Sequence, residues 1–329
     1  MTLPRIYITQ PVASGAIERL KQVADVRWNP DPLHIMTQQE LVAAARASDI
    51  LFCLLHDHID AEVINANPRL RAVASMTITP ADIDIAAATA RRIPVTVIPA
   101  LLLDDATADL AWALLLSLVR RVTEGDRLLR SGTFPGSQSC YMEGSGITGK
   151  TLGIVGMGGV GRAAAARAHA FKLKVIYHDP RRLDPADEQA QKLTWVPFEQ
   201  LLAESDFVSI HAKLIPETRH LFNDAAFSRM KPSACLINTA RGPIVDEEAL
   251  VRALIDQRIA GAGLDVYENE PRPHPELLQM QNVVMTPHTG SAIRELRAAM
   301  ANVVVDNILA LLDGKQPPNC WNAEIYGKQ

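Results

Sequence analysis

The stretch that decides the fold is TLGIVGMGGVG, which runs from Thr151 to Gly161. Its apolar half is typical of a buried strand, its glycines follow the pattern G-x-G-x-x-G, and the alanine-rich stretch Arg162–Phe171 after it has the composition of a helix. In this setting the first glycine permits a tight turn, the second lets backbone amides approach a pyrophosphate, and the third packs helix against strand. The helix amino terminus offers unpaired N–H groups to the phosphates. We therefore predict a dinucleotide-binding turn with the contacts Gly156, Gly158, Gly159, Val160 and Gly161.

The charges after the next predicted strand bear on the choice of dinucleotide. The strand Lys174–His178 ends at Asp179, about 20 residues past the glycines, where an acid is placed to bind ribose hydroxyls. This carboxylate would repel a 2′-phosphate, so we expect NAD(H) to be preferred. Arg181 and Arg182 follow at once and could accommodate that phosphate, although solvated loop charges are the simpler interpretation. NADP(H) therefore stays open as a second cofactor.

Length and charge restrict the class of protein. The 329 residues exceed the usual size of one domain and fit two domains with separate cores. The net charge is −4 and no long basic run occurs, so we expect neither nucleic acid nor a membrane surface as a partner. The longest apolar stretch, Leu110–Val119, is too short to cross a bilayer, and the amino terminus lacks the apolar segment of a signal peptide. We expect a cytoplasmic protein.

The four cysteines lie far apart in the sequence and form no C-x-x-C pair. This spacing favours dispersed buried thiols in a reducing compartment over disulfides or a zinc site, so no metal is expected. The cysteines are Cys53, Cys140, Cys235 and Cys320.

Short apolar runs alternate with helical patterns in the first hundred residues, and the alternation restarts at Lys150. Such alternation predicts α/β domains, each with a parallel sheet covered by helices on both faces. Strands are predicted at Ile6–Thr9, Ile50–Leu54, Ala72–Ser75 and Val95–Ile98, and then at Thr151–Val155, Lys174–His178, Phe207–Ile210, Ala234–Asn238, Gly261–Val266 and Val283–Met285. The second group has six strands, the number typical of a doubly wound dinucleotide domain.

Helices are predicted between these strands and beside the two groups. The early ones are Ala13–Val23, Thr37–Ala47 and Ile83–Ala90. Asp105–Leu129 has few breakers and is predicted as one long helix that bridges two domains. The segment Ser131–Gly146, rich in glycine, proline and serine, is predicted as a surface excursion, and the last helix, Ala292–Leu312, is long enough to cross back to the first domain.

Three of the later strands are followed by side chains suited to one reaction. Arg241, Glu270 and His288 come after successive predicted strands, and open parallel sheets bind ligands beyond the carboxyl ends of their strands. Arginine offers a rigid fork of donors to a carboxylate or carbonyl. Histidine can exchange a proton near neutral pH, and a glutamate beside it favours the imidazolium. We predict a crevice beside a nicotinamide in which these three residues act together.

Each of the three has a simpler interpretation when taken alone. Arg241 could cap a helix or make a surface ion pair, Glu270 before a proline could be exposed, and His288 could be a turn residue. Their joint placement at one edge of a sheet favours the catalytic interpretation.

In sequence, the chain resembles the NAD(P)-dependent D-isomer specific 2-hydroxyacid dehydrogenases over nearly its whole length. The matching motifs, in this order, are Asp105–Ala111, Gly149–Gly156, Asn238–Gly242, Gly263–Val266 with Glu270-Pro271, and Thr286-Pro287-His288. The resemblance implies direct hydride transfer without a metal between a 2-oxo acid and a D-2-hydroxy acid. It implies that Arg241 binds the substrate, that His288 paired with Glu270 is the general acid/base, and that Asp265 holds the nicotinamide carboxamide. The cofactor contacts expected besides the glycine-rich turn and Asp179 are Thr107, Thr239, Ala240, Asp265 and Gly290.

The resemblance also implies a domain arrangement and an assembly. A Rossmann dinucleotide domain, residues 104–291, is expected to be inserted into a discontinuous flavodoxin-like substrate domain, residues 1–103 and 292–329. A homodimer built largely by the nucleotide domains is expected, with a small 2-oxo or 2-hydroxy acid as the partner molecule.

The chain departs from the family pattern where the substrate is expected. The family loop that grips the carboxylate through backbone N–H groups has a glycine where this chain has Thr79, and Pro80 removes a donor. We therefore name Thr77, Ile78 and Thr79, together with Arg241, as substrate contacts, with the threonine hydroxyls as substitutes. The segment Leu101–Asp104 is one residue longer than usual, and Lys213 replaces a proline close to the expected cofactor.

Two other functions remain compatible with the motifs. One branch of the family oxidises phosphite, but Met76 or Thr77 stands where that branch carries a lysine. The transcriptional co-repressors that resemble these enzymes sense NAD and retain much of the same residue set, so Arg241, Glu270 and His288 do not exclude such a role. The absence of long charged tails favours the enzyme.

Overall fold

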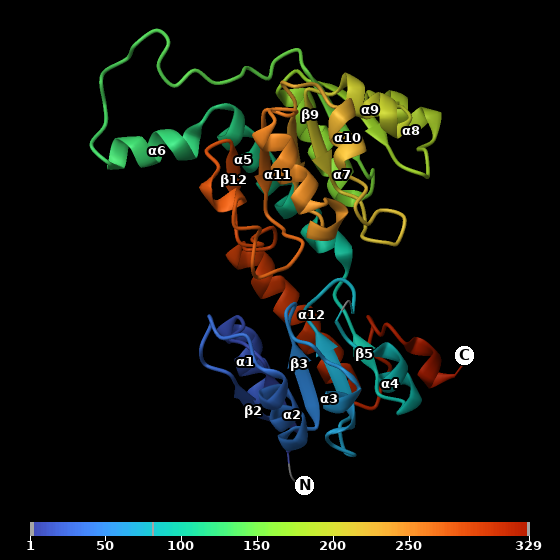
Figure 1. Cartoon of the computed structure of the whole chain (residues 1–329). Helices are drawn as coiled ribbons and strands as arrows, with labels where there is room; N and C mark the ends of the chain where they lie inside the picture. The colour runs from blue at the N-terminus through green and yellow to red at the C-terminus, as the bar shows by residue number, and fades with distance from the viewer. Residues whose placement is uncertain (1–2, 81, 328–329) are drawn as a thin grey trace. The chain divides into compact units, whose positions relative to one another are not determined.

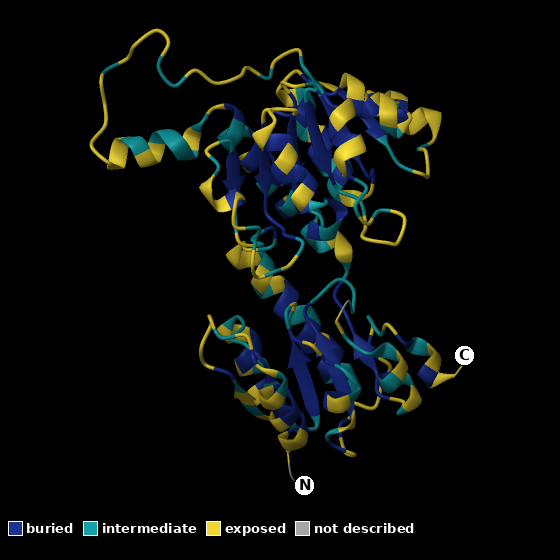
Figure 2. Cartoon of the chain, viewed as in Figure 1, coloured by how far each residue is buried: buried dark blue, intermediate teal, exposed yellow. Residues whose placement is uncertain are grey.

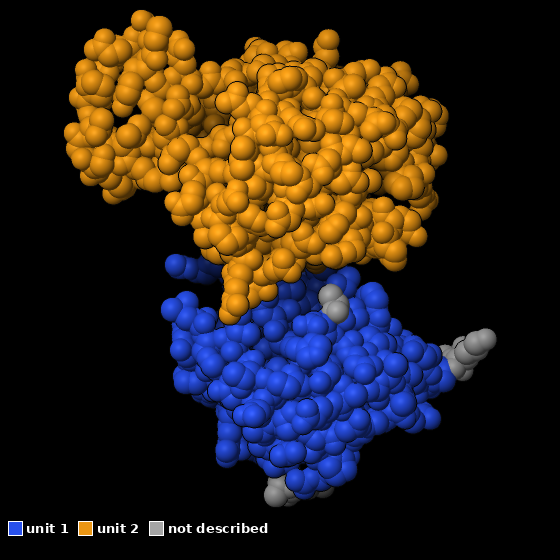
Figure 3. Space-filling model, in the orientation of Figure 1, with its two compact units in different colours: residues 1–102, 292–329 blue, residues 103–291 orange. Residues whose placement is uncertain are grey.

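The computed structural model describes residues 3–80 and 82–327, and these divide into two compact units (Figure 3). Unit 1 comprises residues 1–102 and 292–329, and unit 2 comprises residues 103–291. Unit 1 is therefore discontinuous in sequence, and unit 2 is inserted into it. Both are α/β structures with a parallel sheet, as the alternation of apolar runs predicts.

Unit 1 is built on a five-stranded parallel sheet of order β2-β1-β3-β4-β5, which is the flavodoxin-like order (Figure 1). Helices α2, α3 and α4 pack on one core of this sheet, and α12 packs on α1 and β4. The strands are β1 (Arg5–Ile8), β2 (Asp25–Trp28), β3 (Ile50–Cys53), β4 (Ala72–Ser75) and β5 (Val95–Thr96). The helices are α1 (Ser14–Lys21), α2 (Gln38–Ala47), α3 (Ala61–Asn65), α4 (Ile85–Ala90), α12 (Arg294–Leu312) and the 3-10 turn η4 (Ala323–Tyr326), with η1 (Ala100–Leu103) at the boundary to unit 2.

Unit 2 is built on a seven-stranded parallel sheet of order β12-β11-β10-β9-β6-β7-β8. The chain order reverses between β6 and β9, which creates the crevice where doubly wound sheets bind dinucleotides. The strands are β6 (Thr151–Val155), β7 (Lys174–His178), β8 (Leu193–Trp195), β9 (Phe207–Ile210), β10 (Cys235–Asn238), β11 (Gly261–Leu264) and β12 (Val283–Met285). The helices are α5 (Asp104–Val119), α6 (Val122–Arg130), α7 (Gly159–Ala170), α8 (Pro185–Ala190), α9 (Phe198–Glu204), α10 (Asp224–Arg229) and α11 (Glu247–Ile255), with the 3-10 turns η2 (Gly242–Ile244) and η3 (Leu277–Gln279).

The sheet of unit 2 has a separate apolar core on each face. Successive residues of a strand point to opposite faces, so Ile154 joins the core beneath α5 and α7, whereas Val155 joins the core beneath α9, α10 and α11. Trp112 of α5 fixes the first of these layers, since its indole N–H donates to the carbonyl of Ala164 at 3.0 Å. Figure 2 shows the buried strands as the continuous dark interior of the unit. This rigid sheet positions the loops at its carboxyl edge.

Several sequence predictions of secondary structure were wrong. Strands β2 and β8 were not predicted, because both are short edge strands with polar residues among the apolar ones; unit 2 therefore has seven strands and not six. Helix α3 was missed as well. The predicted long helix Asp105–Leu129 ends at Val119, and Arg121 adopts a left-handed conformation with φ 53° before α6 begins. Helix α5 packs on α7 and the β10–β12 strands within unit 2, so it is a core helix and not a bridge.

The cysteines differ in their exposure. Cys53 and Cys235 are buried, as predicted, whereas Cys140 lies exposed in the excursion after α6 and Cys320 is half-buried. The sequence prediction of four buried thiols was therefore wrong for two of them. All four are free.

Across the described residues, every helix is too short or too polar to traverse a lipid bilayer.

Candidate active site

The glycine-rich turn joins β6 to α7 with the geometry that its sequence predicts. Gly156 has φ 95°, a left-handed conformation that other residues rarely adopt, and a Cβ there would lie 2.6 Å from the backbone nitrogen of Ala212. A Cβ on Gly161 would lie 2.1 Å from the carbonyl oxygen of Gly156, so a side chain there would separate helix from strand. Gly158 is the N-cap of α7, and the space where its Cβ would project is open. Together these features leave an accessible helix amino terminus at the crevice of the sheet.

Asp179 closes this turn on the side of β7. One carboxylate oxygen accepts the backbone N–H of Met157 at 2.8 Å, and the other accepts that of Arg181 at 2.9 Å. The carboxylate therefore orders the backbone of the glycine-rich turn directly.

The two arginines after Asp179 differ in their contacts. Arg182 makes a two-point ion pair with Glu188 at 2.8 and 2.9 Å and stacks over the ring of Trp195. The guanidinium lowers the pKa of Glu188 to about 2, and the hydroxyl of Tyr177 donates to the same carboxylate. For the exposed side chain of Arg181, the structure records no such contact among the described residues. The charge of Arg182 is thus paired within the protein, with Glu188.

Arg241 follows β10, and an asparagine shapes the turn that carries it. The buried side chain of Asn238 accepts the N–H of Ala240 at 3.0 Å and donates to the carbonyl of Arg241 at 3.1 Å. The Arg241 guanidinium donates to the carbonyl of Ala240 at 2.6 Å, which is the only hydrogen bond recorded for it in the described part of the chain. Burial lowers the pKa of Arg241, an effect that the charge of Glu270 opposes. The arginine thus keeps donors for a ligand.

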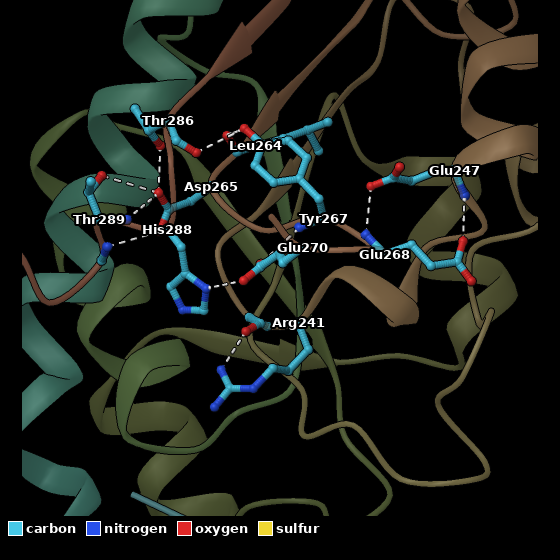
Figure 4. Close-up of polar contacts among 12 residues, drawn as sticks. Arg241, Glu247, Leu264, Asp265, Tyr267, Glu268, Glu270, Thr286, His288 and Thr289 are labelled. Atoms are coloured by element: carbon cyan, nitrogen blue, oxygen red, sulfur yellow. Dashed lines mark hydrogen bonds and ion pairs between the residues drawn. The ribbon is translucent and has the colours of Figure 1, made fainter. Parts of the chain in front are cut away.

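His288 and Glu270 lie in direct contact. The Nδ1 atom of His288 is 2.8 Å from Oε2 of Glu270, and the other carboxylate oxygen accepts the backbone N–H of Tyr267 at 3.1 Å (Figure 4). His288 has φ 52°, and its N–H donates to the carbonyl of Asp265 at 2.8 Å. Figure 4 shows Arg241 on the side of Glu270 away from Asp265. Two contacts therefore orient the imidazole: the backbone hydrogen bond of His288 to Asp265 and the ring contact with Glu270.

Asp265 organises the loop that carries the histidine. Its carboxylate is 1% exposed and accepts the Thr286 hydroxyl at 2.6 Å, the N–H of Thr289 at 2.7 Å and the N–H of Gly290 at 2.9 Å. Thr107 of α5 lies close to the same loop, because a Cβ on Gly290 would be 3.6 Å from the hydroxyl oxygen of Thr107. Asp265, Gly290 and Thr107 thus form one corner of the site. Asp265 therefore fixes the loop after β12, which presents His288.

A second pair of carboxylates braces the loop that carries Glu270. Glu247, at the start of α11, accepts the N–H of Glu268 at 2.7 Å, and Glu268 accepts the N–H of Glu247 at 3.4 Å (Figure 4). Glu268 also contacts His220 at 2.5 Å. Burial raises the pKa of Glu247. These contacts tie the loop to a helix and so restrict where Glu270 can lie.

Two polar atoms near the crevice are buried without a partner in the described residues: the hydroxyl of Thr239 and Nδ1 of His211. Thr239 follows β10 and His211 follows the neighbouring strand β9, both at the carboxyl edge. Burial lowers the pKa of His211 to about 4. An unsatisfied hydroxyl at the same edge of the sheet as the open glycine-rich turn is suited to a polar dinucleotide, so the residues present fit such a cofactor.

The predicted substrate loop belongs to unit 1, where it follows β4. The hydroxyl of Thr77 lies 2.6 Å from that of Ser75 and donates to the carbonyl of Thr79 at 2.7 Å. Its proton is thus used within the loop. Together with Leu54, Leu55, Asp57, Asp82 and Ile83, residues Ser75, Thr77 and Thr79 line a small hollow of unit 1.

Sequence reasoning named the residues that end the strands but missed those that hold them. Asn238, Tyr267, Thr286 and Thr289 were not among the predicted site residues, although each lies within three residues of one. The signal was available, because all four occur at the carboxyl edge that locates ligand sites in open parallel sheets. Glu247 lies on a helix, and no sequence signal connects it to Glu270.

Comparison with known proteins identifies relatives of this chain in sequence and in fold. The family model described as D-isomer specific 2-hydroxyacid dehydrogenase, NAD binding domain, matches residues 112–290. A glyoxylate reductase of Thermococcus litoralis is 41% identical over 98% of both chains. Among solved structures, a protein from Thermus thermophilus has a TM-score of 0.88 and 39% identity, covering 96% of this chain and 99% of its own. A glyoxylate reductase from Paecilomyes thermophila has a TM-score of 0.82 and 29% identity, covering 98% and 100%.

The family model matches more than half of the chain, and the relatives match its whole length. These matches define the class of protein: NAD-dependent oxidoreductases of 2-oxo and 2-hydroxy acids. The chain belongs to the D-isomer specific 2-hydroxyacid dehydrogenase family, and it carries the NAD-binding domain of that family.

Proposed function

We propose that this protein is an NADH-dependent reductase of a small 2-oxo acid, with His288 as its general acid/base. The observation that carries this proposal is the 2.8 Å contact between His288 and Glu270, beside a half-buried arginine at the carboxyl edge of a parallel sheet. Relatives named glyoxylate reductase, identical at about 40%, support a small substrate such as glyoxylate.

The cofactor would lie along the carboxyl edge of the unit 2 sheet. Its diphosphate would meet the glycine-rich turn, its ribose Asp179, and its nicotinamide the corner formed by Asp265, Gly290 and Thr107. The orphaned hydroxyl of Thr239 and the adjacent Ala240 would line the same crevice. When bound, the reduced cofactor supplies the hydride that reaches the carbonyl carbon of the substrate. Unit 2 would thus be the cofactor domain and unit 1 the substrate domain, and their boundary lies one residue before the one predicted from the sequence.

Three side chains would do the remaining work. The guanidinium of Arg241 binds the substrate carboxylate and polarises its carbonyl through two parallel N–H donors. His288 gives a proton to the carbonyl oxygen as that oxygen gains charge, and takes it back in the reverse direction. Glu270 accepts a hydrogen bond from Nδ1–H of His288. The opposite ring nitrogen, Nε2, therefore carries the proton that is transferred to the substrate.

The substrate carboxylate would also meet the loop of Thr77, Ile78 and Thr79. Because the Thr77 hydroxyl donates to the Thr79 carbonyl, the backbone N–H groups and the Thr79 hydroxyl are the donors that we assign to the carboxylate. This assignment refines the sequence prediction, which allowed either threonine hydroxyl.

We propose that NADH is preferred over NADPH. Asp179 would repel a 2′-phosphate, and Arg182, which would otherwise attract it, is paired with Glu188. The ratio of kcat/KM for NADH and NADPH tests this assignment. A value of kcat/KM that is higher with NADPH would show that the charge of Arg181 outweighs that of Asp179.

We also propose a homodimer formed through unit 2. Helix α6 has no buried residue, and the excursion after it extends away from the sheet of its own unit (Figure 1). Its apolar side chains Val122, Leu129 and Phe134 are between 57% and 71% exposed, a degree of exposure that favours a protein partner.

The experiment that tests the function is NADH oxidation by the purified protein with 2-oxo acids of graded size, from glyoxylate to sugar-derived acids. Rapid turnover of the smallest acids is expected. NAD reduction by phosphite would instead assign the protein to the phosphite branch. Tight NADH binding without turnover of any acid would contradict the reductase and favour a nucleotide sensor.

A further inference from the structure

Asp104, the first residue of α5, lies against Gly159, the first residue of α7. A Cβ built on Gly159 would lie 2.0 Å from Oδ2 of Asp104 and 2.5 Å from Oδ1. The carboxylate therefore occupies the position that the side chain of any other residue at 159 would take. A side chain at 159 would require this carboxylate to move, and the glycine-rich turn is where we place the diphosphate of the cofactor.

The packing of the two helices places the backbone of Asp104 beside the glycine-rich turn. Trp112, two turns further along α5, donates to the carbonyl of Ala164 in α7 and stacks on Phe171 with ring centroids 4.7 Å apart. Arg167 of α7 reaches back to Asp105 at 2.9 Å and to Asp109 at 2.7 Å. Helices α5 and α7 are thus fixed side by side.

No positive side chain in the described residues neutralises Asp104. Of the arginines on α7, Arg167 pairs with Asp105 and Asp109, and Arg162 lies 3.6 Å from Asp187. Burial and the charge of Asp105 raise the pKa of Asp104. The Asp104 carboxylate, which has no ion-pair partner among the described residues, thus lies at the amino terminus of α7. Helix amino termini attract anions, so a phosphate group bound there would lie close to this negative charge.

The next turn of α5 connects this carboxylate to the other end of the expected cofactor. Thr107 lies three residues after Asp104 on the same helix face, and its hydroxyl lies near Gly290 in the corner formed by Asp265. The first turn of α5 therefore runs from the glycine-rich turn toward the corner assigned to the nicotinamide. A dinucleotide in this crevice would bring its diphosphate near Asp104.

We propose that Asp104 sets the affinity for the cofactor by opposing its diphosphate electrostatically at the glycine-rich turn. The inference rests on the proposed cofactor site and adds a residue that limits binding strength. Weakened binding favours release of the oxidised cofactor, which can limit turnover in enzymes that close over their ligands. Two like charges a few ångströms apart in a partly buried site interact strongly enough to change a dissociation constant by roughly tenfold.

The test compares Asp104→Asn with Asp105→Asn. Both acids lie in the first turn of α5, so both substitutions remove one charge and a similar interaction with the helix dipole. The side chain of Asp105 is 83% exposed and paired with Arg167, which makes it the matched control. Binding of NADH, ADP and adenosine is measured by calorimetry at low and high salt, and thermal unfolding establishes that both variants fold.

The inference predicts that Asp104→Asn lowers the Kd for NADH and for ADP by roughly 5- to 20-fold at low salt, with a smaller gain at high salt. The Kd for adenosine, which lacks phosphate, should change less than twofold, and Asp105→Asn should change all three values less than twofold.

Three results would overturn the inference. An unchanged Kd for ADP in Asp104→Asn would show that the carboxylate does not act on the diphosphate. Weaker NADH binding would show that Asp104 is a ligand of the cofactor. An equal gain in both variants would assign the effect to general charge. Failure of the wild-type protein to bind either NADH or ADP would instead contradict the cofactor site itself.

Discussion

At the scale of single residues, the site depends on how His288 is held. Its left-handed backbone is fixed by the hydrogen bond to Asp265, and its ring by the contact with Glu270. Two adjacent loops thus determine the ring position before any substrate arrives. In the proposed mechanism, this preorganisation would let His288 transfer a proton without a preceding rearrangement.

Replacement of the histidine tests its role as general acid/base. In His288→Gln the amide can still contact Glu270 but cannot transfer a proton at neutral pH. The value of kcat should fall roughly 10²-fold or more, while the Kd for NADH stays within twofold. Steady-state kinetics and NADH binding measure the two quantities.

The matched control is His274→Gln, which alters a histidine outside the site that is paired with Glu248 at 3.1 Å. This variant should keep the kcat of the wild type. Near-normal turnover of His288→Gln would remove the residue from the mechanism.

Replacement of Arg241 by lysine tests whether geometry or charge binds the substrate. Lysine keeps the positive charge but loses the planar fork that matches a carboxylate. We expect KM for the 2-oxo acid to rise by roughly 10- to 100-fold, with an unchanged Kd for NADH. An unaltered KM in Arg241→Lys would show that the fork is not needed, and Arg252→Lys, at an exposed ion pair with Asp224, is the control.

At the scale of elements, the sequence predicted best the strands that are almost wholly buried. The bounds of β4, β6, β7, β9 and β12 were predicted to the residue, and for β6, β9 and β12 a glycine or polar residue bounds the run on both sides. The predictions for β3, β10 and β11, which are buried along their whole length, were one or two residues too long because apolar residues continue beyond the strand ends. The edge strands β2 and β8 were missed because part of each is solvated, which removes the continuous apolar run. The break between α5 and α6 was missed because Arg120-Arg121 gives no glycine or proline signal.

The functional site followed a similar division. Arg241, Glu270 and His288 could be proposed from the sequence because each follows a strand at the carboxyl edge of the sheet. The contact between Asp104 and Gly159 could not, since it depends on how two helices pack, and the first turn of α5 has no motif that indicates it. Long-range packing of this kind is decided by the whole core.

The end of β9 carries a pH-sensitive group, His211. Its pKa in the folded protein is about 4, below the ordinary value of 6.5 for an unfolded chain, because burial disfavours the charged ring. The unfolded state therefore takes up a proton first as the pH falls. The stability that the neutral ring contributes is complete above about pH 6.5 and is lost progressively between pH 6.5 and pH 4.

We expect the free energy of unfolding to depend less on pH in His211→Asn than in the wild type. The free energy of unfolding of the wild type should fall by roughly 1–3 kcal/mol more than that of the variant between about pH 7 and pH 4. Denaturant titrations at a series of pH values measure it. Parallel pH profiles for the two proteins would show that His211 is not the group responsible.

At the scale of the whole molecule, the two units carry different sets of the proposed site residues. Unit 2 contains Arg241, Glu270, His288 and the glycine-rich turn, whereas unit 1 carries the loop of Thr77 to Thr79. The insertion of unit 2 into unit 1 links the two by two chain crossings.

The proposed dimer is tested through the excursion after α6. Phe134→Asp places a charge on an apolar side chain that is 71% exposed, so it should convert a dimer to a monomer if that surface is the interface. Light scattering coupled to gel filtration gives the mass. Leu33→Asp, at a site in unit 1 that is 90% exposed, should leave the mass unchanged, and a monomeric wild type would contradict the proposal.

The central claim is that the protein reduces a 2-oxo acid with NADH to the D-hydroxy acid. The most direct measurement is the reaction of NADH with a prochiral 2-oxo acid such as pyruvate, followed by chiral analysis of the product. We predict one D-2-hydroxy acid formed for each NADH oxidised. Formation of the L-isomer, or NADH bound without oxidation by pyruvate or glyoxylate, would contradict the account.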